Sequence, residues 1–215
     1  MRRIVVIIAA LFVCNALWAQ DTKANKILDE VSAKTKTYKS ISADFVFSME
    51  NKEMEIDEQN EGSIKLKGQK YCVALPGVGI EVFSDGTTLW NYMKEGNQVT
   101  ISSIDDESSE LMDPSSLFTI YEKGFRSEFV DEKKEGTKTV YRINLFPDSD
   151  AYEVSKIEVS IDKATMMIHE ATLYGTDGNL YGILVKRIES DKDLSDSDFI
   201  FDVSKYADVE VIDFR

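Results

Sequence analysis

The sequence predicts a mainly β (α+β) fold: a curved half-barrel of about ten antiparallel strands, with an N-terminal helix and a short internal helix over its mouth. Two observations lead to this prediction. Apolar residues alternate with polar ones at period two in short runs, and turn residues separate the runs. A sheet larger than the usual size of about four to six strands tends to curl, so its apolar face is expected to line a concavity.

One amphipathic helix is predicted near the N-terminus. Between residues 24 and 38 apolar residues recur near helical spacing, and charged residues occupy the other face. The period then changes to two. The predicted strands lie near residues 43–49, 64–66, 71–75, 80–82, 89–93, 99–104, 125–129, 140–146, 154–161, 166–174 and 180–188.

Turn residues between these runs predict a meander of hairpins. The turns are Asn60-Glu61-Gly62, Pro76-Gly77, Asp85-Gly86, Gly96-Asn97, Glu135-Gly136 and Asp177-Gly178. Asp-Gly is a strong hairpin signal because it suits backbone conformations with positive φ. An acidic loop over residues 105–110 and a short helix opened by Pro114 are expected to interrupt the sheet.

Residues 1–19 are predicted to be a cleavable secretory signal peptide. Arg2 and Arg3 precede an apolar stretch that is too short to span a bilayer, and cleavage is expected after Ala19. A lipid anchor on Cys14 is rejected because the preceding residue, Val13, is not small. Residues 20–215 are then expected to form a single domain, since no linker divides them.

The charge balance disfavours two classes of partner. The chain has 25 Lys and Arg against 39 Asp and Glu, and loss of Arg2 and Arg3 takes the net charge from −14 to −16. Such a protein repels nucleic acid and anionic membrane surfaces. After cleavage Cys72 is the one remaining cysteine, so no disulfide within the chain is expected despite export.

The chain offers little of the chemistry that an enzyme needs. His169 is the one histidine, and its place in an alternating run predicts an outward-facing strand residue. The carboxylates of residues 105–110 lack calcium-loop spacing, and the glycines at 77 and 79 precede a strand, not a helix. We therefore expect no enzyme, no cofactor and no metal site.

Several short stretches together form a recognisable pattern. In chain order they are Ser40 to Phe45, Gly62 to Leu66, Phe83 to Tyr92, Gln98-Val99-Thr100, Pro114 with Leu117, Phe199 to Val203, and Val209 to Asp213. This pattern resembles the LolA-like outer-membrane lipoprotein carriers. The most specific part is Ser84-Asp85-Gly86 followed by Leu89-Trp90 and the Gln98 strand. The resemblance covers nearly the whole of residues 20–215.

This resemblance implies a periplasmic carrier, or chaperone, with an incomplete antiparallel β-barrel closed by a helical lid. It would be a monomer that accepts acylated lipoproteins from an inner-membrane exporter, shields their acyl chains and delivers them to an outer-membrane acceptor. The family commonly has an arginine after the second strand that holds the lid closed. Lys67 and Lys70 stand there instead, and an ammonium group cannot supply the planar fork of a guanidinium group.

The expected acyl-chain site is the apolar face of the sheet under its helical lid. Its candidate residues are Phe45, Tyr71, Val73, Val82 and Trp90 on strands, with Val31, Leu117 and Phe118 on helices that would move aside. Two alternatives stay open at this point. The same residues would serve the filled core of a non-enzymatic periplasmic scaffold or interaction domain, or a carrier of the same fold for another apolar lipid.

Overall fold

The computed structural model describes residues 22–104, 124–149 and 152–215. The predicted signal peptide over residues 1–19, the acidic loop over residues 105–110 and the internal helix with Leu117 and Phe118 lie outside the described residues. Among the residues that are described, no helix is long and apolar enough to cross a membrane.

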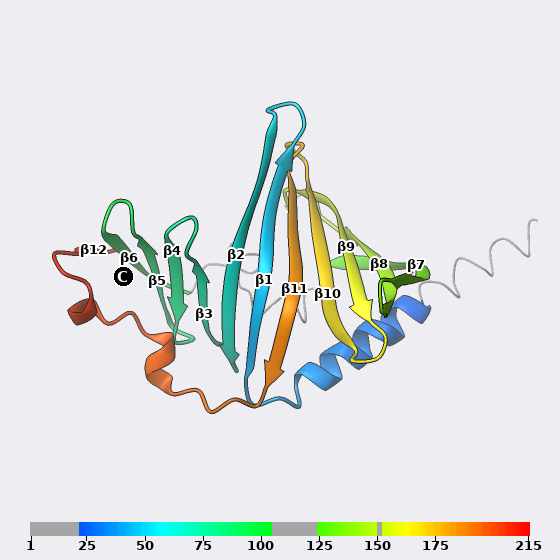
Figure 1. The fold of residues 1–215 in the computed structure, drawn as a ribbon, viewed down its shortest axis with the longest axis horizontal. Helices are drawn as coiled ribbons and strands as arrows, with labels where there is room; N and C mark the ends of the chain where they lie inside the picture. The colour runs from blue at the N-terminus through cyan, green and yellow to red at the C-terminus, as the bar shows by residue number, and fades with distance from the viewer. Residues whose placement is uncertain (1–21, 105–123, 150–151) are drawn as a thin grey trace, which may run out of the picture.

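The described chain forms one curved sheet of twelve strands, not about ten, with an N-terminal helix over residues 22–35 (Figure 1). The strands are β1 (Ile41–Asn51), β2 (Ile56–Lys67), β3 (Lys70–Leu75), β4 (Ile80–Ser84), β5 (Thr88–Met93), β6 (Gln98–Ser103), β7 (Phe125–Glu135), β8 (Lys138–Pro147), β9 (Val154–Asp162), β10 (Met167–Gly175), β11 (Leu180–Ser190) and β12 (Glu210–Asp213). Their order across the sheet is β12-β6-β5-β4-β3-β2-β1-β11-β10-β9-β8-β7.

The sheet is open, because its edge strands β12 and β7 do not pair with each other. The predicted fold class, mainly β with an incomplete barrel and an N-terminal helix, is confirmed. Neighbouring strands are antiparallel with one exception, since β12 runs parallel to β6. The C-terminal arm, residues 191–215, brings β12 there, with two short 3-10 helices on the way, η4 (Asp196–Phe199) and η5 (Val203–Lys205).

The N-terminal helix packs on one end of the sheet only. Its residues Ala24, Ile27, Leu28 and Val31 recur at i, i+3, i+4 and i+7, the spacing that places them on one side of a helix. They are buried against a cluster that β7, β8 and β9 supply, which includes Ile143. Figure 1 shows the helix beside β9 and β10. We call the face of the sheet that carries the helix the inner face.

The C-terminal arm packs on the opposite, outer face at the other end of the sheet. Phe201, 4% exposed, forms a cluster with Tyr92 and Val99 of β5 and β6. The rings of Phe201 and Tyr206 stack with their centroids 4.2 Å apart. In Figure 1 the arm runs from the end of β11 past β3, β4 and β5 to β12. Helix and arm therefore cover different faces and different halves of one sheet.

Most predicted turns lie where expected, and one is wrong. Gly86, Asn97, Gly136 and Gly178 connect hairpin strands and have positive φ, the conformation that favours Gly and Asn. The turn predicted at Asn60-Glu61-Gly62 lies inside β2. Gly62 serves close packing there, because a Cβ atom on it would lie 2.6 Å from the Phe45 ring.

Candidate functional site

A broad apolar surface lies on the inner face beyond the N-terminal helix. Its members come from β1 to β5 and from β11, and most of them are half-buried. They are Phe45, Phe47, Ile64, Tyr71, Val73, Leu75, Ile80, Val82, Leu89, Ile183 and Val185. We call this set the apolar inner surface. None of its residues belongs to the cluster that the helix covers.

Strand register places these side chains on the same face. Val73 of β3 pairs with Val82 of β4, and Tyr71 pairs with Leu66 of β2. Partners directly opposite each other in an antiparallel pair point to the same side of the sheet. The side chains of Phe45 and Leu75 both lie over Gly62. The structure thus brings together four predicted site residues: Phe45, Tyr71, Val73 and Val82.

Trp90 does not join them. It pairs with Phe83, the neighbour of Val82 along β4, so it points to the outer face and packs in the cluster around Phe201. Its predicted place on the inner face is wrong, because β5 carries apolar residues on both faces. Leu89, the residue before it, takes the inner position.

Val31 lies on the inner face but away from the apolar inner surface. It is 1% exposed and packs in the cluster between the helix and the strands β7, β8 and β9. In the described structure it is a core residue of the helix–sheet contact. Any role in admitting a ligand would require the helix to separate from these strands.

Lys67 and Lys70, the predicted latch, hold the C-terminal arm. Both ammonium groups pair with the carboxylate of Asp196 in η4, at 3.2 and 3.1 Å. The Lys67 ammonium also donates to the carbonyl oxygen of Leu194 at 2.7 Å, and Lys65 pairs with Asp198 at 2.9 Å. We call these three lysines and two aspartates the arm clamp.

The arm clamp depends on ionised carboxylates. Hydrogen bonds from Lys70 and Lys67 hold the pKa of Asp196 below its ordinary value, and Lys65 does the same for Asp198. A carboxyl group whose pKa is depressed in the folded state contributes stability above its unfolded pKa, which is about 3.9. That contribution is lost as the pH falls through the folded value.

Acidification below about pH 4 is therefore expected to loosen the arm. With residues 1–19 removed, Trp90 is the only tryptophan, and it packs with the arm, so its emission should shift to the red in this window. Between pH 7 and about pH 5 the emission should not change. The double variant Asp196→Asn, Asp198→Asn should show the shifted emission at pH 7, and an unshifted variant spectrum would contradict the assignment.

Cys72 lies in β3 on the outer face, and burial raises the pKa of its thiol to about 11. A thiol that stays protonated at neutral pH is a poor nucleophile and a poor metal ligand. No group of three His, Cys, Asp or Glu residues within the described parts of the chain is placed to hold a metal ion.

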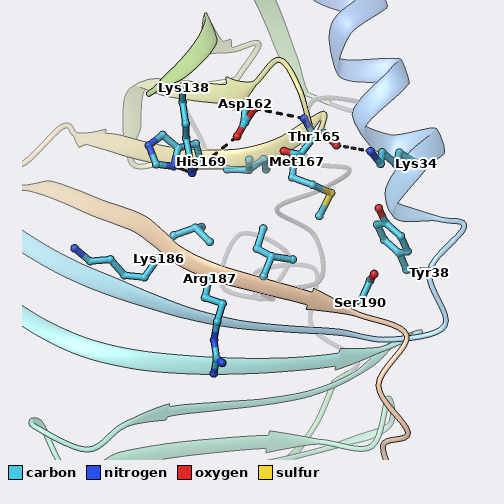
Figure 2. A pocket seen from close by; sticks show the side chains of 13 residues that line it. Lys34, Tyr38, Lys138, Asp162, Thr165, Met167, His169, Lys186, Arg187 and Ser190 are labelled. Atoms are coloured by element: carbon cyan, nitrogen blue, oxygen red, sulfur yellow. Dashed lines mark hydrogen bonds and ion pairs between the residues drawn. The ribbon is translucent and has the colours of Figure 1, made fainter. Parts of the chain in front are cut away.

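A cavity of about 360 Å³ that the sequence does not predict lies between β10 and β11. Pairing between these strands covers Glu170 to Tyr174 and Leu180 to Leu184, and the strands separate beyond it. Met167, Ile188 and Tyr38 form apolar walls, and lysines stand around the opening (Figure 2). The sequence carries no signal for this cavity, because it arises where two strands stop pairing.

Two comparisons find proteins similar to this chain, and a third finds none. Solved structures that resemble it include an uncharacterized conserved protein from Thermus thermophilus, at 15% identity and a TM-score of 0.60 over 89% of this chain and 99% of that one. A DUF1329 family protein from Desulfovibrio piger is 13% identical, with a TM-score of 0.52 over 87% and 99%. A LolA superfamily protein from Nitrosomonas europaea is 12% identical, with a TM-score of 0.44 over 84% and 98%.

At these identities the first two structures show a shared fold alone. No curated protein sequence matches the chain. The family model described as "Outer membrane lipoprotein carrier protein LolA" matches residues 36–202, well over half of the chain. The match spans β1 to β11 and ends within the C-terminal arm, so it includes every strand of the apolar inner surface. The fold is a binding and carrier fold, and the chain belongs to the LolA family of outer membrane lipoprotein carrier proteins.

Proposed function

We propose that this protein is a non-enzymatic periplasmic carrier, exported by means of residues 1–19, that shields the acyl chains of lipoproteins on their way to the outer membrane. The apolar inner surface is the observation that carries the proposal. It lines one face of an open sheet, and the described helix covers only the other end of that face. An extended apolar face of this kind suits a ligand with long saturated chains.

The energetics of acyl chains fit a surface that is open at one side. Each CH₂ group removed from water contributes about 0.8 kcal/mol, so an unshielded chain drives aggregation. A carrier must also release its cargo, which a closed and tightly packed cavity would oppose. Because the sheet does not close, cargo can enter and leave without the separation of paired strands. A monomer that meets an inner-membrane exporter and then an outer-membrane acceptor would use this open side.

The proposal is tested by calorimetric titration of residues 20–215 with a triacylated lipopeptide. We expect saturable binding, and no binding of the same peptide without its acyl chains. Binding of neither peptide would favour the alternative of a periplasmic scaffold with a filled core. If the lipopeptide does not bind but a free lipid co-purifies with the protein, the cargo is another apolar lipid.

Two adjacent residues of β5 offer a test of where the cargo binds. Leu89 lies on the inner face and Trp90 on the outer face. We expect lipopeptide to leave the emission of Trp90 nearly unchanged. In the double variant Leu89→Trp, Trp90→Phe, the emission should shift to the blue on binding, because the indole enters an apolar contact. A large change at Trp90 with none at position 89 would place the cargo on the other face.

A further inference from the structure

The cavity between β10 and β11 is a break in the sheet, not a crevice on its surface. Val185 and Arg187 to Ser190 of β11 pair with β1 on one side, and Lys186 is the extra residue of a β-bulge between them. The other edge of this segment has no ladder partner in β10. Met167 and Ile168 of β10 pair in turn with β9. The cavity of about 360 Å³ therefore lies between the edges of β10 and β11, beside the C-terminal end of the N-terminal helix.

The cavity has one apolar side, which is continuous with the apolar inner surface. Met167, Tyr38 and Ile188 line it, and all three belong to a cluster that also contains Val73, Val82 and Leu89. Met167 is 5% exposed and belongs both to the cavity lining and to this cluster. An apolar chain on the inner surface can thus have its polar end at this opening.

The other side of the cavity is basic, although the protein as a whole is strongly acidic. Lys34, Lys138 and Lys186 line it, with His169, whereas the net charge of the chain is −14. Asp162 is the one carboxylate among the described lining residues, and its Oδ1 accepts hydrogen bonds from the backbone of Ala164 and Thr165. Its Oδ2 forms an ion pair with the ammonium group of Lys138, at 3.9 Å.

The lysines differ in which partners their ammonium groups already have. The ammonium group of Lys34 donates to the carbonyl oxygen of Thr165, which fixes its position but does not cancel its charge. Lys138 lies 3.3 Å from Nδ1 of His169. Among the described residues, none forms an ion pair or hydrogen bond with the ammonium group of Lys186. Arg187, by contrast, pairs with Asp44, and Figure 2 shows it extending away from Met167 and Tyr38.

We propose that this cavity binds the anionic head group, a phosphate or carboxylate, of an amphiphile whose chain lies on the apolar inner surface. Lys34, Lys138 and Lys186 would bind the anion by charge-assisted hydrogen bonds, which are stronger than neutral ones. Lysine suits this role because its ammonium group can approach a phosphate oxygen from several directions. This inference rests on the proposed carrier function and adds a charged lipid to its cargo.

The test compares three probes in calorimetric titrations below their micelle concentrations: lauroyl glycerol phosphate, lauroyl glycerol and glycerol phosphate. We expect the phosphorylated amphiphile to bind at least about tenfold more tightly than the neutral one. Glycerol phosphate, which lacks the chain, should not bind detectably. Equal affinity for the two amphiphiles would overturn the inference, and so would equal affinity for glycerol phosphate and its lauroyl ester.

Variants then locate the anion. The double variant Lys34→Gln, Lys186→Gln should bind the phosphorylated amphiphile about tenfold more weakly, and its affinity for the neutral amphiphile should be unchanged. The matched control, Lys94→Gln with Lys134→Gln, removes the same charge from exposed residues outside the cavity and should change neither. An equal loss in both variants would mean a long-range effect of net charge and would reject the cavity.

The same experiment separates this inference from the carrier proposal. If the triacylated lipopeptide binds but the phosphorylated amphiphile binds no more tightly than the neutral one, only the inference of an anion site is rejected. If neither lipopeptide nor amphiphile binds, both fail together. Circular dichroism of each variant confirms that its fold is retained, which the exposed or half-buried positions of these lysines favour.

Discussion

Replacement of Phe201 by alanine is expected to lower the free energy of unfolding by about 3–5 kcal/mol, the range for a buried phenylalanine. Phe201 is 4% exposed. Its ring contacts Tyr206, Tyr92 and Phe83, with centroid separations of 4.2, 5.4 and 5.8 Å. Phe201 thus packs on aromatic rings of both β4 and β5. Tyr206 supports the same contact, because its ring lies 4.6 Å from that of Tyr92 and its hydroxyl group donates to the carboxylate of Glu81 at 2.8 Å.

Two probes of urea unfolding distinguish loss of the arm from loss of the sheet. The Phe201 cluster holds the arm on β4, β5 and β6, so the Phe201→Ala variant should lose the arm at a lower urea concentration than the sheet. Trp90 emission follows the arm, because Trp90 packs in this cluster, and circular dichroism follows the sheet. Coincident transitions in the variant would show that arm and sheet unfold as one unit.

Phe214→Ala is the matched control, since Phe214 belongs to the same arm and is 72% exposed. It should change the free energy of unfolding by less than about 0.5 kcal/mol. A comparable loss in both variants would mean that phenylalanine in the arm stabilises the protein by something other than the Phe201 contacts.

The sequence predicts the strands well where one face is apolar and the other polar. In β9 the alternation over Lys156 to Asp162 is clean, and the strand lies where it was expected. In β5, Thr88-Leu89-Trp90-Asn91-Tyr92, both faces carry apolar residues, because the arm covers one and the inner surface lies on the other. Alternation alone does not tell which face is inner, and Trp90 was misplaced for this reason.

Contacts between distant parts of the chain are the other features that the sequence does not reveal. Lys67 reaches Asp196, which is 129 residues further along the chain, and no local pattern predicts that pairing. The parallel strand β12 has only four residues, Glu210 to Asp213, and two of them are acidic. Its place in the sheet follows from the clamp and the Phe201 cluster, which carry the arm to β6.

Gly62 shows how a composition typical of a turn can have another cause. Asn60-Glu61-Gly62 has the composition of a turn, yet the chain continues as a strand through it. The glycine is required because the Phe45 ring occupies the space of a side chain at position 62. Gly62 thus forms part of the floor of the apolar inner surface, a role that depends on the β1–β2 register of Phe45 opposite Gly62.

Replacement of Val82 by aspartate is expected to weaken lipopeptide binding about a hundredfold or more. Val82 is half-buried, pairs with Val73 and belongs to the cluster around Tyr71 and Leu66. A carboxylate at this position must lose part of its hydration when a saturated chain covers it. Its side chain is too short to reach water around the chain, as a lysine could. Calorimetric titration with the triacylated lipopeptide measures the loss.

Val211→Asp is the matched control, because it makes the same change at an exposed residue of β12. It should leave the affinity for lipopeptide unchanged, and equal losses in the two variants would reject the inner surface as the acyl-chain site. Val82→Asp also distinguishes carrier from scaffold. In a filled core, an unpaired carboxylate would mainly destabilise the fold, by a few kcal/mol, whether or not any ligand is present. On an open surface the carboxylate stays hydrated until cargo arrives, so the cost appears mainly in binding.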